Sequence, residues 1–299
     1  MFEIHISTKN RRVDLLFTLT QLQTILDRTD LGCVVFDDGS TDGTYEAVSN
    51  QFPKVRLLRN EKSKGYLYCR NQMLNQTQAD YAISLDDDAH FLSANPLEEI
   101  QSYFMQNPDC GLIAFRLFWS LESPKSIQTS EKPHQAQSYV GCGHAWRMKA
   151  WRDIPNYPEW FEFYGEENIA SLHLFKKGWR VDYLPQVLVQ HRVDLKKRTQ
   201  SNNDFAFRYR RSIRSGWYSF LLFFPKAIAL ELLAYSIYTQ FKTKIFKGDF
   251  KVILPLFLAI TDLFLALPKI FKYQNRLTAD EYKKYTQLKV DNIYWEPEK

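Results

Sequence analysis

The stretch Cys33–Thr44 reads CVVFDDGSTDGT, so four apolar residues run directly into two carboxylates, a glycine turn and a helix start. A second segment, Tyr81–Asp88, reads YAISLDDD and repeats this pattern with three carboxylates. In open α/β sheets, ligands bind outside the carboxyl ends of the parallel strands. Both acidic clusters are therefore expected to face one crevice, where a nucleotide would be held.

Three adjacent carboxylates, Asp86, Asp87 and Asp88, end the second of these segments. Like charges at this spacing repel one another unless a cation or hydrogen-bond donors compensate them. Divalent cations such as Mg²⁺ bind carboxylate oxygens and substrate phosphates together. The triplet therefore predicts a metal-bound diphosphate, and an acidic turn that binds no ligand is the alternative.

Length and composition predict a folded protein with one large α/β core and an appendage, because 299 residues with 45% hydrophobic content can bury such a core. The net charge of +5 is mild, and basic residues become denser after Arg192. This local patch favours an anionic surface or phosphate groups as partner, and no nucleic acid is expected. The cysteines lack metal-type spacing, so reduced buried thiols are expected.

Apolar periodicity predicts strands that alternate with helices, which is typical of parallel βαβ units. The expected strands cover residues 2–6, 33–36, 55–58, 81–85, 111–118, 179–183 and 187–190. Residues 120–138 read as a long surface loop. From residue 208 the chain is basic, then apolar and helical. We therefore predict a nucleotide-binding catalytic domain over 1–207 and a helical region over 208–299.

The ordered set DDGSTDGT at 37–44, LDDD at 85–88, GEEN at 165–168 and the later His191 resembles family-2-type glycosyltransferases of the GT-A fold. The resemblance covers about residues 2–195. It implies an α/β fold with a Rossmann-like, mostly parallel sheet flanked by helices and a helical C-terminal region. The chain after Arg208 is similar to that of bacterial polysaccharide glycosyltransferases, including rhamnosyltransferase-type enzymes, that work at the inner membrane surface.

The resemblance places the base of the nucleotide-sugar donor against Asp38, with Ser7 or Thr8 on the other side. A carboxylate beside the imide N–H of uracil or thymine forms a charge-assisted hydrogen bond, which favours a UDP or dTDP donor. Three basic residues, Lys62, Lys64 and Arg70, precede or enter a helix and are in reach of a diphosphate. A solvated face is the favoured interpretation for them, and Lys64 is retained as a donor-binding candidate.

The resemblance also assigns the acidic triplet. Asp86 lies near the ribose, Asp87 is the variable middle residue on the donor side, and Asp88 ligates a divalent cation that His191 helps to hold. Oxygen ligands with one imidazole suit Mn²⁺ or Mg²⁺. The cation would neutralise the departing nucleoside diphosphate.

Two carboxylates, Glu166 and Glu167, are predicted to open a helix. The positive end of the helix dipole favours their ionised form, which a general base needs. The family motif usually reads Glu-Asp with the Asp as base, so Glu167 inherits that role here. Glu166 would position the acceptor or the loop.

The apolar C-terminal region is interrupted by Pro225, Pro255 and Pro268, and lysines flank its segments. This pattern favours helices that lie at an interface with anionic lipid headgroups. A water-soluble cap or homodimer surface and true spanning helices are the alternatives. The N-terminus has no basic or long apolar region typical of a secretory signal, so a cytoplasmic protein at the inner face of the plasma membrane is predicted.

These observations together predict an inverting, metal-dependent glycosyltransferase. It would move a sugar to a hydroxyl of a glycan or lipid-linked acceptor in cell-surface polysaccharide synthesis. A sugar nucleotidyltransferase normally needs a glycine-rich loop after the first strand, and residues 7–12 contain no glycine. A catalytically inactive donor-binding or scaffold protein is the other alternative. The sugar, the acceptor and the linkage do not follow from the sequence.

Overall fold

The computed structural model describes residues 1–194 and 202–290. The chain divides into two compact units. The first contains residues 1–162, 173–193 and the described part of 288–299, and the second contains the described parts of 163–172 and 194–287. Helix α9 (Asn202–Phe223) belongs to the second unit, so the boundary predicted at residue 207 falls within this helix.

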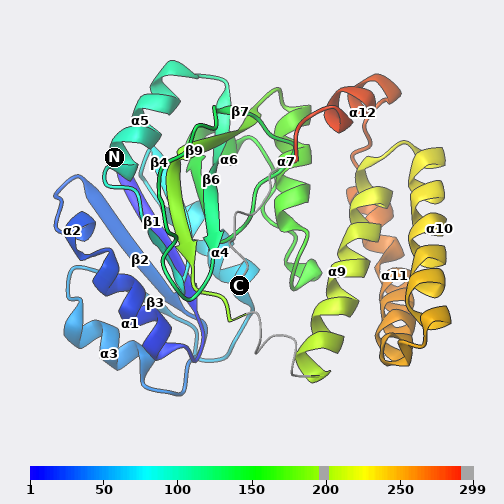
Figure 1. Cartoon of the computed structure of the whole chain (residues 1–299), viewed down its shortest axis with the longest axis horizontal. Helices are drawn as coiled ribbons and strands as arrows, with labels where there is room; N and C mark the ends of the chain where they lie inside the picture. Colours follow the sequence, from blue (N-terminus) through cyan, green and yellow to red (C-terminus); the bar gives the residue numbers. More distant parts are fainter. Residues whose placement is uncertain (195–201, 291–299) are drawn as a thin grey trace. The chain divides into compact units, whose positions relative to one another are not determined.

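Among the described residues, nine strands form one sheet in the first unit (Figure 1). Its order is β3 (Arg56–Arg59), β2 (Leu31–Asp37), β1 (Phe2–Thr8), β4 (Tyr81–Asp86), β8 (Gly143–Arg147), β6 (Cys110–Trp119), β9 (Arg180–His191) and β5 (Ala89–Phe91), with β7 (His134–Gln135) beside β9. The first four strands are parallel, whereas β8 is antiparallel to both its neighbours. The predicted parallel pattern therefore holds for the N-terminal part of a mixed sheet.

Helices cover both faces of this sheet because its central strands are apolar on both sides. On one face of β2, Cys33 and Val35 belong to the same core as Leu15 and Leu19 of α1. On the other face, Val34 and Phe36 pack against α4. The helices of this unit are α1 (Arg12–Gln21), α2 (Gln23–Leu26), α3 (Thr44–Gln51), α4 (Tyr66–Gln76), α5 (Pro96–Gln106), α6 (Met148–Arg152) and the short η1 (Glu159–Phe161). Burial on both faces is the expected environment of parallel strands.

Two features of the sheet differ from the predicted elements. The strand segments expected at 179–183 and 187–190 are one strand, β9, whose pairing with β6 shifts register between Phe115 and Arg116. Strands β5, β7 and β8 were not predicted. A Cβ atom on Gly143 would lie 2.9 Å from Leu117 Cδ2, so glycine is what allows β8 to approach its neighbours this closely.

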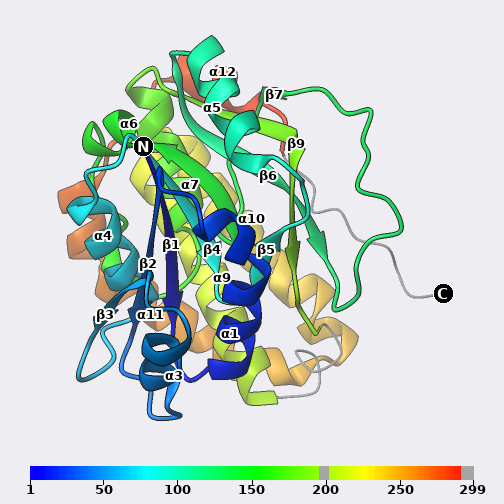
Figure 2. The same ribbon diagram turned by 90° about the vertical axis from the view of Figure 1, so that its left-hand side faces the viewer.

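Between β6 and β7 the chain runs through residues 120–133 without helix or strand, and Figure 2 shows this segment as a long extended loop. It is the larger part of the surface loop predicted at 120–138, whose last residues include β7. The guanidinium of Arg116 on β6 donates to the backbone carbonyls of Ile127 and Gln128. The side-chain amide of Gln190 on β9 donates to the carbonyls of Ser120 and Glu122. Two sheet residues thus anchor the loop.

The second unit is helical. It contains α9, α10 (Lys226–Thr243), the short η2 (Ile245–Lys247) and η3 (Phe250–Val252), α11 (Ile253–Tyr273) and α12 (Ala279–Thr286), together with the first residues of α7 (Glu166–Lys176). In Figure 1, α9, α10 and α11 lie side by side. This agrees with the predicted helical C-terminal region.

Candidate functional site

Parallel pairing of β1, β2 and β4 brings their carboxyl ends to one edge of the sheet. Thr8, the last residue of β1, lies opposite Asp37, and Ser7 lies opposite Asp86. The residues that follow β2 and β4 are the two acidic clusters. The register therefore places these clusters on either side of the end of β1, as the sequence predicts.

Asp38 is buried and organises the loop that follows β3. Its two carboxylate oxygens accept four hydrogen bonds, from Asn60 Nδ2 at 2.7 Å, Ser63 Oγ at 2.6 Å, Lys64 N at 2.8 Å and Gly65 N at 2.9 Å. Burial acts to raise the pKa of Asp38, but these bonds outweigh it and lower the pKa. The carboxylate is therefore a structural acceptor for residues 60–65, and its contact with a donor base stays a prediction.

The two other residues proposed to line the base pocket have different environments. Thr8 is buried, and its hydroxyl donates to Asp87 Oδ2 at 2.8 Å. Ser7 is half-buried on β1. The exposed ammonium of Lys64 lies over the ring of Tyr68, 4.7 Å from its centre, and donates to the Tyr68 hydroxyl. In this structure the contact of Lys64 with the acidic residues is made by its backbone N–H, which donates to Asp38 Oδ1.

Asp86 is held by a buried arginine. Arg70 Nη2 on α4 donates to Asp86 Oδ1 at 2.6 Å and to the carbonyl of Gly141 at 2.9 Å. The Arg70 side chain is only 5% exposed. The expectation of a solvated face was therefore wrong for Arg70, because helix α4 turns this side chain toward the carboxyl end of β4.

Asp87 is also buried and has polar partners on three sides. It accepts from Thr8, pairs with Arg11 Nε at 2.9 Å, and its backbone carbonyl accepts from Thr18 Oγ1 at 2.7 Å. Burial is the largest influence on this group, and together with the neighbouring carboxylate of Asp88 it raises the pKa of Asp87 to about 7. Asp87 is thus linked to β1 and α1 in this structure.

Asp88 is the carboxylate in contact with His191. Its Oδ1 lies 2.9 Å from His191 Nε2, and its Oδ2 lies 2.6 Å from Arg11 Nη2. Burial would raise the pKa of Asp88, yet the imidazole and the guanidinium outweigh it and lower the pKa. The two residues predicted to hold a cation, Asp88 and His191, are therefore adjacent in space.

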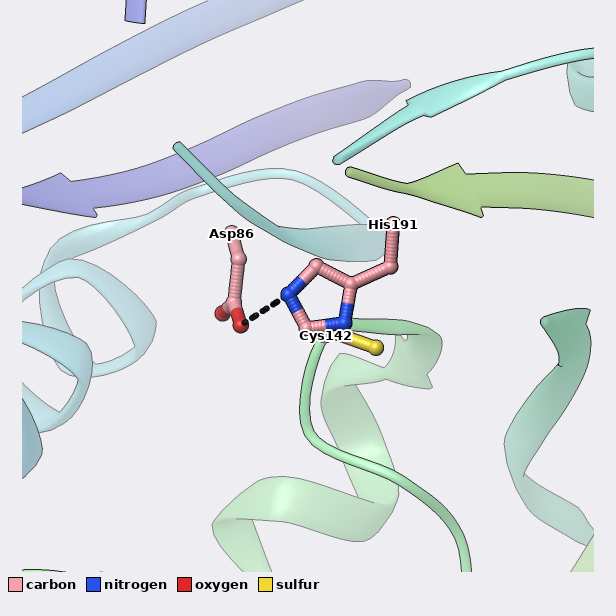
Figure 3. A group of neighbouring side chains, drawn as sticks. All are labelled: Asp86, Cys142 and His191. Carbon is pink, nitrogen blue, oxygen red and sulfur yellow. Dashed lines mark ion pairs between the residues drawn. The ribbon is translucent and has the colours of Figure 1, made fainter. Parts of the chain in front are cut away.

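A third donor group adjoins His191. Asp86, Cys142 and His191 each offer one ligand atom, and these atoms all lie within 4.8 Å of one another (Figure 3). Figure 3 shows the imidazole between the carboxylate of Asp86 and the sulfur of Cys142. Cys142 was predicted only to be a buried thiol, since the four cysteines are scattered and show no CxxC spacing.

This donor set fits a hard divalent cation through its oxygen and imidazole groups. His191 Nε2 lies 2.9 Å from Asp88 Oδ1 and 3.8 Å from Asp86 Oδ2. Carboxylates with imidazole suit Mn²⁺ or Mg²⁺, whereas the thiol of Cys142 is a softer ligand. The carboxylate and imidazole groups at this edge are thus suited to such a cation, and the assignment of Asp88 and His191 as its ligands stays a prediction.

The predicted catalytic pair opens α7. Gly165 precedes it with φ 87°, and Glu166 is buried whereas Glu167 is half-buried. The carbonyl of Glu167 accepts from the side-chain hydroxyl of Ser171 at 2.7 Å, and both glutamates lie in the first turn of the helix. Both carboxylates therefore stand at the positive end of the helix dipole, as expected.

Just before α7, two contacts tie the chain to α9. Arg208 Nη1 donates to the hydroxyl of Tyr164 at 3.0 Å, and Ser215 Oγ donates to the carbonyl of Phe163. Tyr164 has a positive φ of 68°, unusual for a residue with a side chain. Helix α9 thus fixes the start of α7, which carries Glu166 and Glu167.

This chain has a mixed sheet with helices on both faces and carboxylates beyond its parallel strands, and it shares the GT-A class of glycosyltransferase fold with solved structures. The family model for glycosyl transferase family 2 matches residues 3–158, more than half of the chain. The chain therefore belongs to glycosyl transferase family 2. None of the curated protein sequences matches it significantly.

Solved structures support the same fold. The mannosyltransferase PcManGT from Pyrobaculum calidifontis, in complex with GDP-Man and Mn²⁺, has a TM-score of 0.57 at 15% identity, over 96% of this chain and 78% of that chain. S. aureus TarS 1-349 in complex with UDP-GlcNAc has a TM-score of 0.58 at 16% identity, over 92% and 81%. GalNAc-T7 with UDP, GalNAc and Mn²⁺ has a TM-score of 0.58 at 13% identity, over 75% and 48%. This chain thus spans about half of GalNAc-T7.

Proposed function

We propose that this glycosyltransferase is an inverting, metal-dependent enzyme that transfers a sugar from a UDP or dTDP sugar to a hydroxyl of a glycan or lipid-linked acceptor in cell-surface polysaccharide synthesis. The observation that carries the metal dependence is the group of donor atoms from Asp86, Cys142 and His191, which lie within 4.8 Å of one another, with Asp88 Oδ1 2.9 Å from His191 Nε2. The complexes of similar proteins with UDP-GlcNAc, or with GDP-Man and Mn²⁺, support a nucleotide-sugar donor and a divalent cation.

In the proposed single displacement, Glu167 accepts the proton of the acceptor hydroxyl while that oxygen attacks the anomeric carbon of the sugar. The bond to the nucleoside diphosphate breaks as the new glycosidic bond forms, so the configuration inverts and no covalent nucleophile is needed. Mn²⁺ or Mg²⁺, when held by Asp86, Asp88 and His191, would neutralise charge on the departing diphosphate. Glu166 keeps its proposed role in positioning the acceptor or the loop.

The donor side of the proposed site is built from Ser7, Thr8, Asp38 and the residues that Asp38 holds. Within that loop, Lys64 contributes its backbone N–H to Asp38, and its ammonium is exposed. Arg70 adds a fixed positive charge beside Asp86. This combination of a carboxylate-organised loop and buried positive charge is suited to an anionic nucleotide.

We also propose that the enzyme works in the cytoplasm at the inner face of the plasma membrane, bound through α10 and α11. By length and composition, Phe250–Tyr273 qualifies among the described residues as a membrane span, with a mean hydropathy of 2.1 and 33% of its most apolar window buried. The acidic residue within it, Asp262, is paired: it accepts from Arg210 Nε at 2.7 Å and from Arg214 Nη1 at 2.9 Å, both on α9.

These ion pairs favour surface binding over spanning, because a helix that left α9 to cross a bilayer would leave Asp262 without its partners. The face of α11 opposite α9 exposes large apolar side chains: Ile253, Leu254, Phe257, Phe264, Leu265 and Phe271. Lysines lie near both ends of this stripe: Lys244, Lys247, Lys251, Lys269 and Lys272. An apolar stripe with lysines at both ends suits a helix that lies flat among anionic headgroups. A surface that pairs two copies of the chain is the alternative.

A thermal-shift panel tests the donor and metal parts together. Purified protein is heated with UDP, dTDP, GDP and their sugar conjugates, with Mn²⁺ or with EDTA. A ligand that binds the folded state raises the melting temperature by mass action. We expect the uracil or thymine nucleotides to raise it with Mn²⁺ and to lose most of that effect in EDTA. Donor hydrolysis by the same sample separates an enzyme from an inactive binding protein.

A further inference from the structure

Arg11 stands between β1 and α1 and pairs with two carboxylates of the acidic triplet, Asp87 and Asp88, and with Asp14. Its Nε lies 2.9 Å from Asp87 Oδ1, and its Nη2 lies 2.6 Å from Asp88 Oδ2 and 3.1 Å from Asp14 Oδ2. A single guanidinium therefore compensates three carboxylates, two of them buried. The sequence predicts that a cation or hydrogen-bond donors offset the charge of this triplet, and in this structure Arg11 supplies positive charge to Asp87 and Asp88.

The second arginine at this edge has a different environment. Arg70 is 5% exposed and also donates to the carbonyl of Gly141, so its side chain is fixed by the core. The Arg11 side chain is 41% exposed, and its ion-pair partners among residues 1–194 and 202–290 are Asp14, Asp87 and Asp88. The Arg70 side chain is thus buried and held in place, whereas the Arg11 side chain is partly exposed and can move into solvent.

The geometry of Asp88 makes Arg11 a competitor of the cation. One oxygen of Asp88 faces His191 and the other faces Arg11. A divalent cation bound to Asp88 would bring two positive charges within a few ångströms of the guanidinium, and at such distances repulsion in a partly buried site is strong. We propose that Arg11 is an internal counter-cation that keeps Asp87 and Asp88 compensated in the metal-free protein and that the divalent cation displaces it from Asp88. This inference rests on the proposed metal site.

Displacement has a consequence for donor binding. A guanidinium carries five N–H donors in a planar fork that matches phosphate oxygens. Once released from Asp88, Arg11 remains tethered at the start of α1, on the edge of the sheet where the diphosphate is proposed to lie. Arg11 is therefore a positioning residue. It holds the carboxylates of Asp87 and Asp88 in place in the metal-free protein, and after the cation binds it is free to bind a phosphate oxygen of the donor.

The test compares Arg11→Gln with Arg12→Gln in the full chain. Arg12 is exposed and adjacent, and no ion pair of its side chain occurs in the described part of the chain, so its substitution removes the same charge without the contacts. Two quantities are measured: the melting temperature in EDTA and the affinity for Mn²⁺ alone, by electron paramagnetic resonance of the free ion. Arg11→Lys, which keeps the charge, is the conservative variant.

We expect Arg11→Gln to melt about 3 °C or more below Arg12→Gln in EDTA, because the triplet loses its counter-cation. At the same time it should bind Mn²⁺ about tenfold more tightly than the wild type, because its competitor is gone, while Arg12→Gln changes the affinity less than about twofold. Arg11→Lys should restore both quantities toward the wild type. A merely structural arginine would not produce tighter binding.

Mn²⁺ affinity that is equal in the wild type and Arg11→Gln, or weaker in the variant, would overturn the competition while leaving the metal site in place. Absence of Mn²⁺ binding by the wild type and every variant would overturn both this inference and the proposed metal dependence. If Arg11→Gln does not fold, Arg11→Lys decides alone: its single ammonium competes less well than the fork, so its Mn²⁺ affinity must exceed that of the wild type.

Discussion

The carboxylate of Asp88 meets the imidazole of His191 at 2.9 Å because β5 pairs with the end of β9. In that antiparallel pair, Ala89 lies directly opposite His191, so the residue before Ala89 is brought to the imidazole by strand register. The backbone N–H of Arg192 also donates to the carbonyl of Asp88 at 2.9 Å. The proposed metal site is therefore positioned by the sheet itself, and its ligands come from strand ends.

The assignment of the general base predicts a difference between two neighbouring glutamates. Glu167→Gln should keep donor affinity near that of the wild type and lower kcat by roughly 10² or more, the effect of losing a general base. Glu166→Gln is the matched comparison, since it removes the adjacent carboxylate of the same helix turn. Steady-state kinetics with a fixed acceptor measure both. If Glu166→Gln is the crippled enzyme and Glu167→Gln is not, the two roles are exchanged.

The loop held by Asp38 predicts a stability effect that depends on pH. The pKa of Asp38 is lowered in the folded protein, so its ionised carboxylate stabilises the fold above about pH 4 and this contribution is lost as the pH falls through the lowered pKa. Asp38→Asn should therefore lose about 1–3 kcal/mol at pH 7, because its amide nitrogen replaces one of the two oxygens and cannot accept the bond from Lys64 N or from Gly65 N that this oxygen accepts.

Urea unfolding at a series of pH values measures this loss. The difference between wild type and Asp38→Asn should narrow below about pH 4. Glu61→Gln, which changes an exposed carboxylate at the start of the same loop, is the control and should be nearly neutral. A difference that stays constant down to low pH would show that the charge of Asp38 does not stabilise the loop.

The outer face of α11 predicts binding to anionic vesicles. Replacing Phe257 and Phe264 together by alanine should weaken binding about tenfold or more, since each ring would bury apolar area in the membrane. Binding should also weaken with salt, because the contribution of the lysines is screened. Val13→Ala with Met105→Ala, which changes exposed apolar residues of the other unit, is the matched control.

Co-sedimentation with anionic vesicles at low and high salt measures this binding. Protein that stays in the supernatant under both conditions would contradict the proposed binding to a membrane surface. If, in addition, the Phe257 and Phe264 variant converts a dimer in solution into a monomer, the apolar face pairs two copies of the chain. A short water-soluble acceptor should be used by the variant as well as by the wild type, since α11 carries none of the proposed catalytic residues.

The sequence was sufficient for the strand ends that build the acidic edge. Apolar runs stop abruptly at Asp37 and Asp86, and parallel register then brings these ends together. His191 was assigned by the resemblance to family-2-type glycosyltransferases, as the histidine that follows GEEN along the chain. The strand ends are local features, and the GT-A fold that the resemblance implied is confirmed.

The partners of the carboxylates were not predictable from sequence. Arg70 reads as one more helix residue, and only the packing of α4 shows that it faces Asp86. Cys142 reaches His191 because an antiparallel strand, β8, enters between β4 and β6, and antiparallel insertion leaves no pattern in a short segment with two glycines. Long-range pairing of this kind depends on the whole sheet and not on local periodicity.

The central claim is that Asp88 and His191 hold a divalent cation for a nucleotide donor. Calorimetric titration of UDP and dTDP with Mn²⁺ into the wild type, Asp88→Ala and His191→Ala tests it most directly, with Asp280→Ala of α12 as an exposed control and melting curves to confirm folding. We expect binding by the wild type and the control that is lost in EDTA, and no metal-dependent binding by the other two variants. Unchanged affinity in both Asp88→Ala and His191→Ala would contradict the claim.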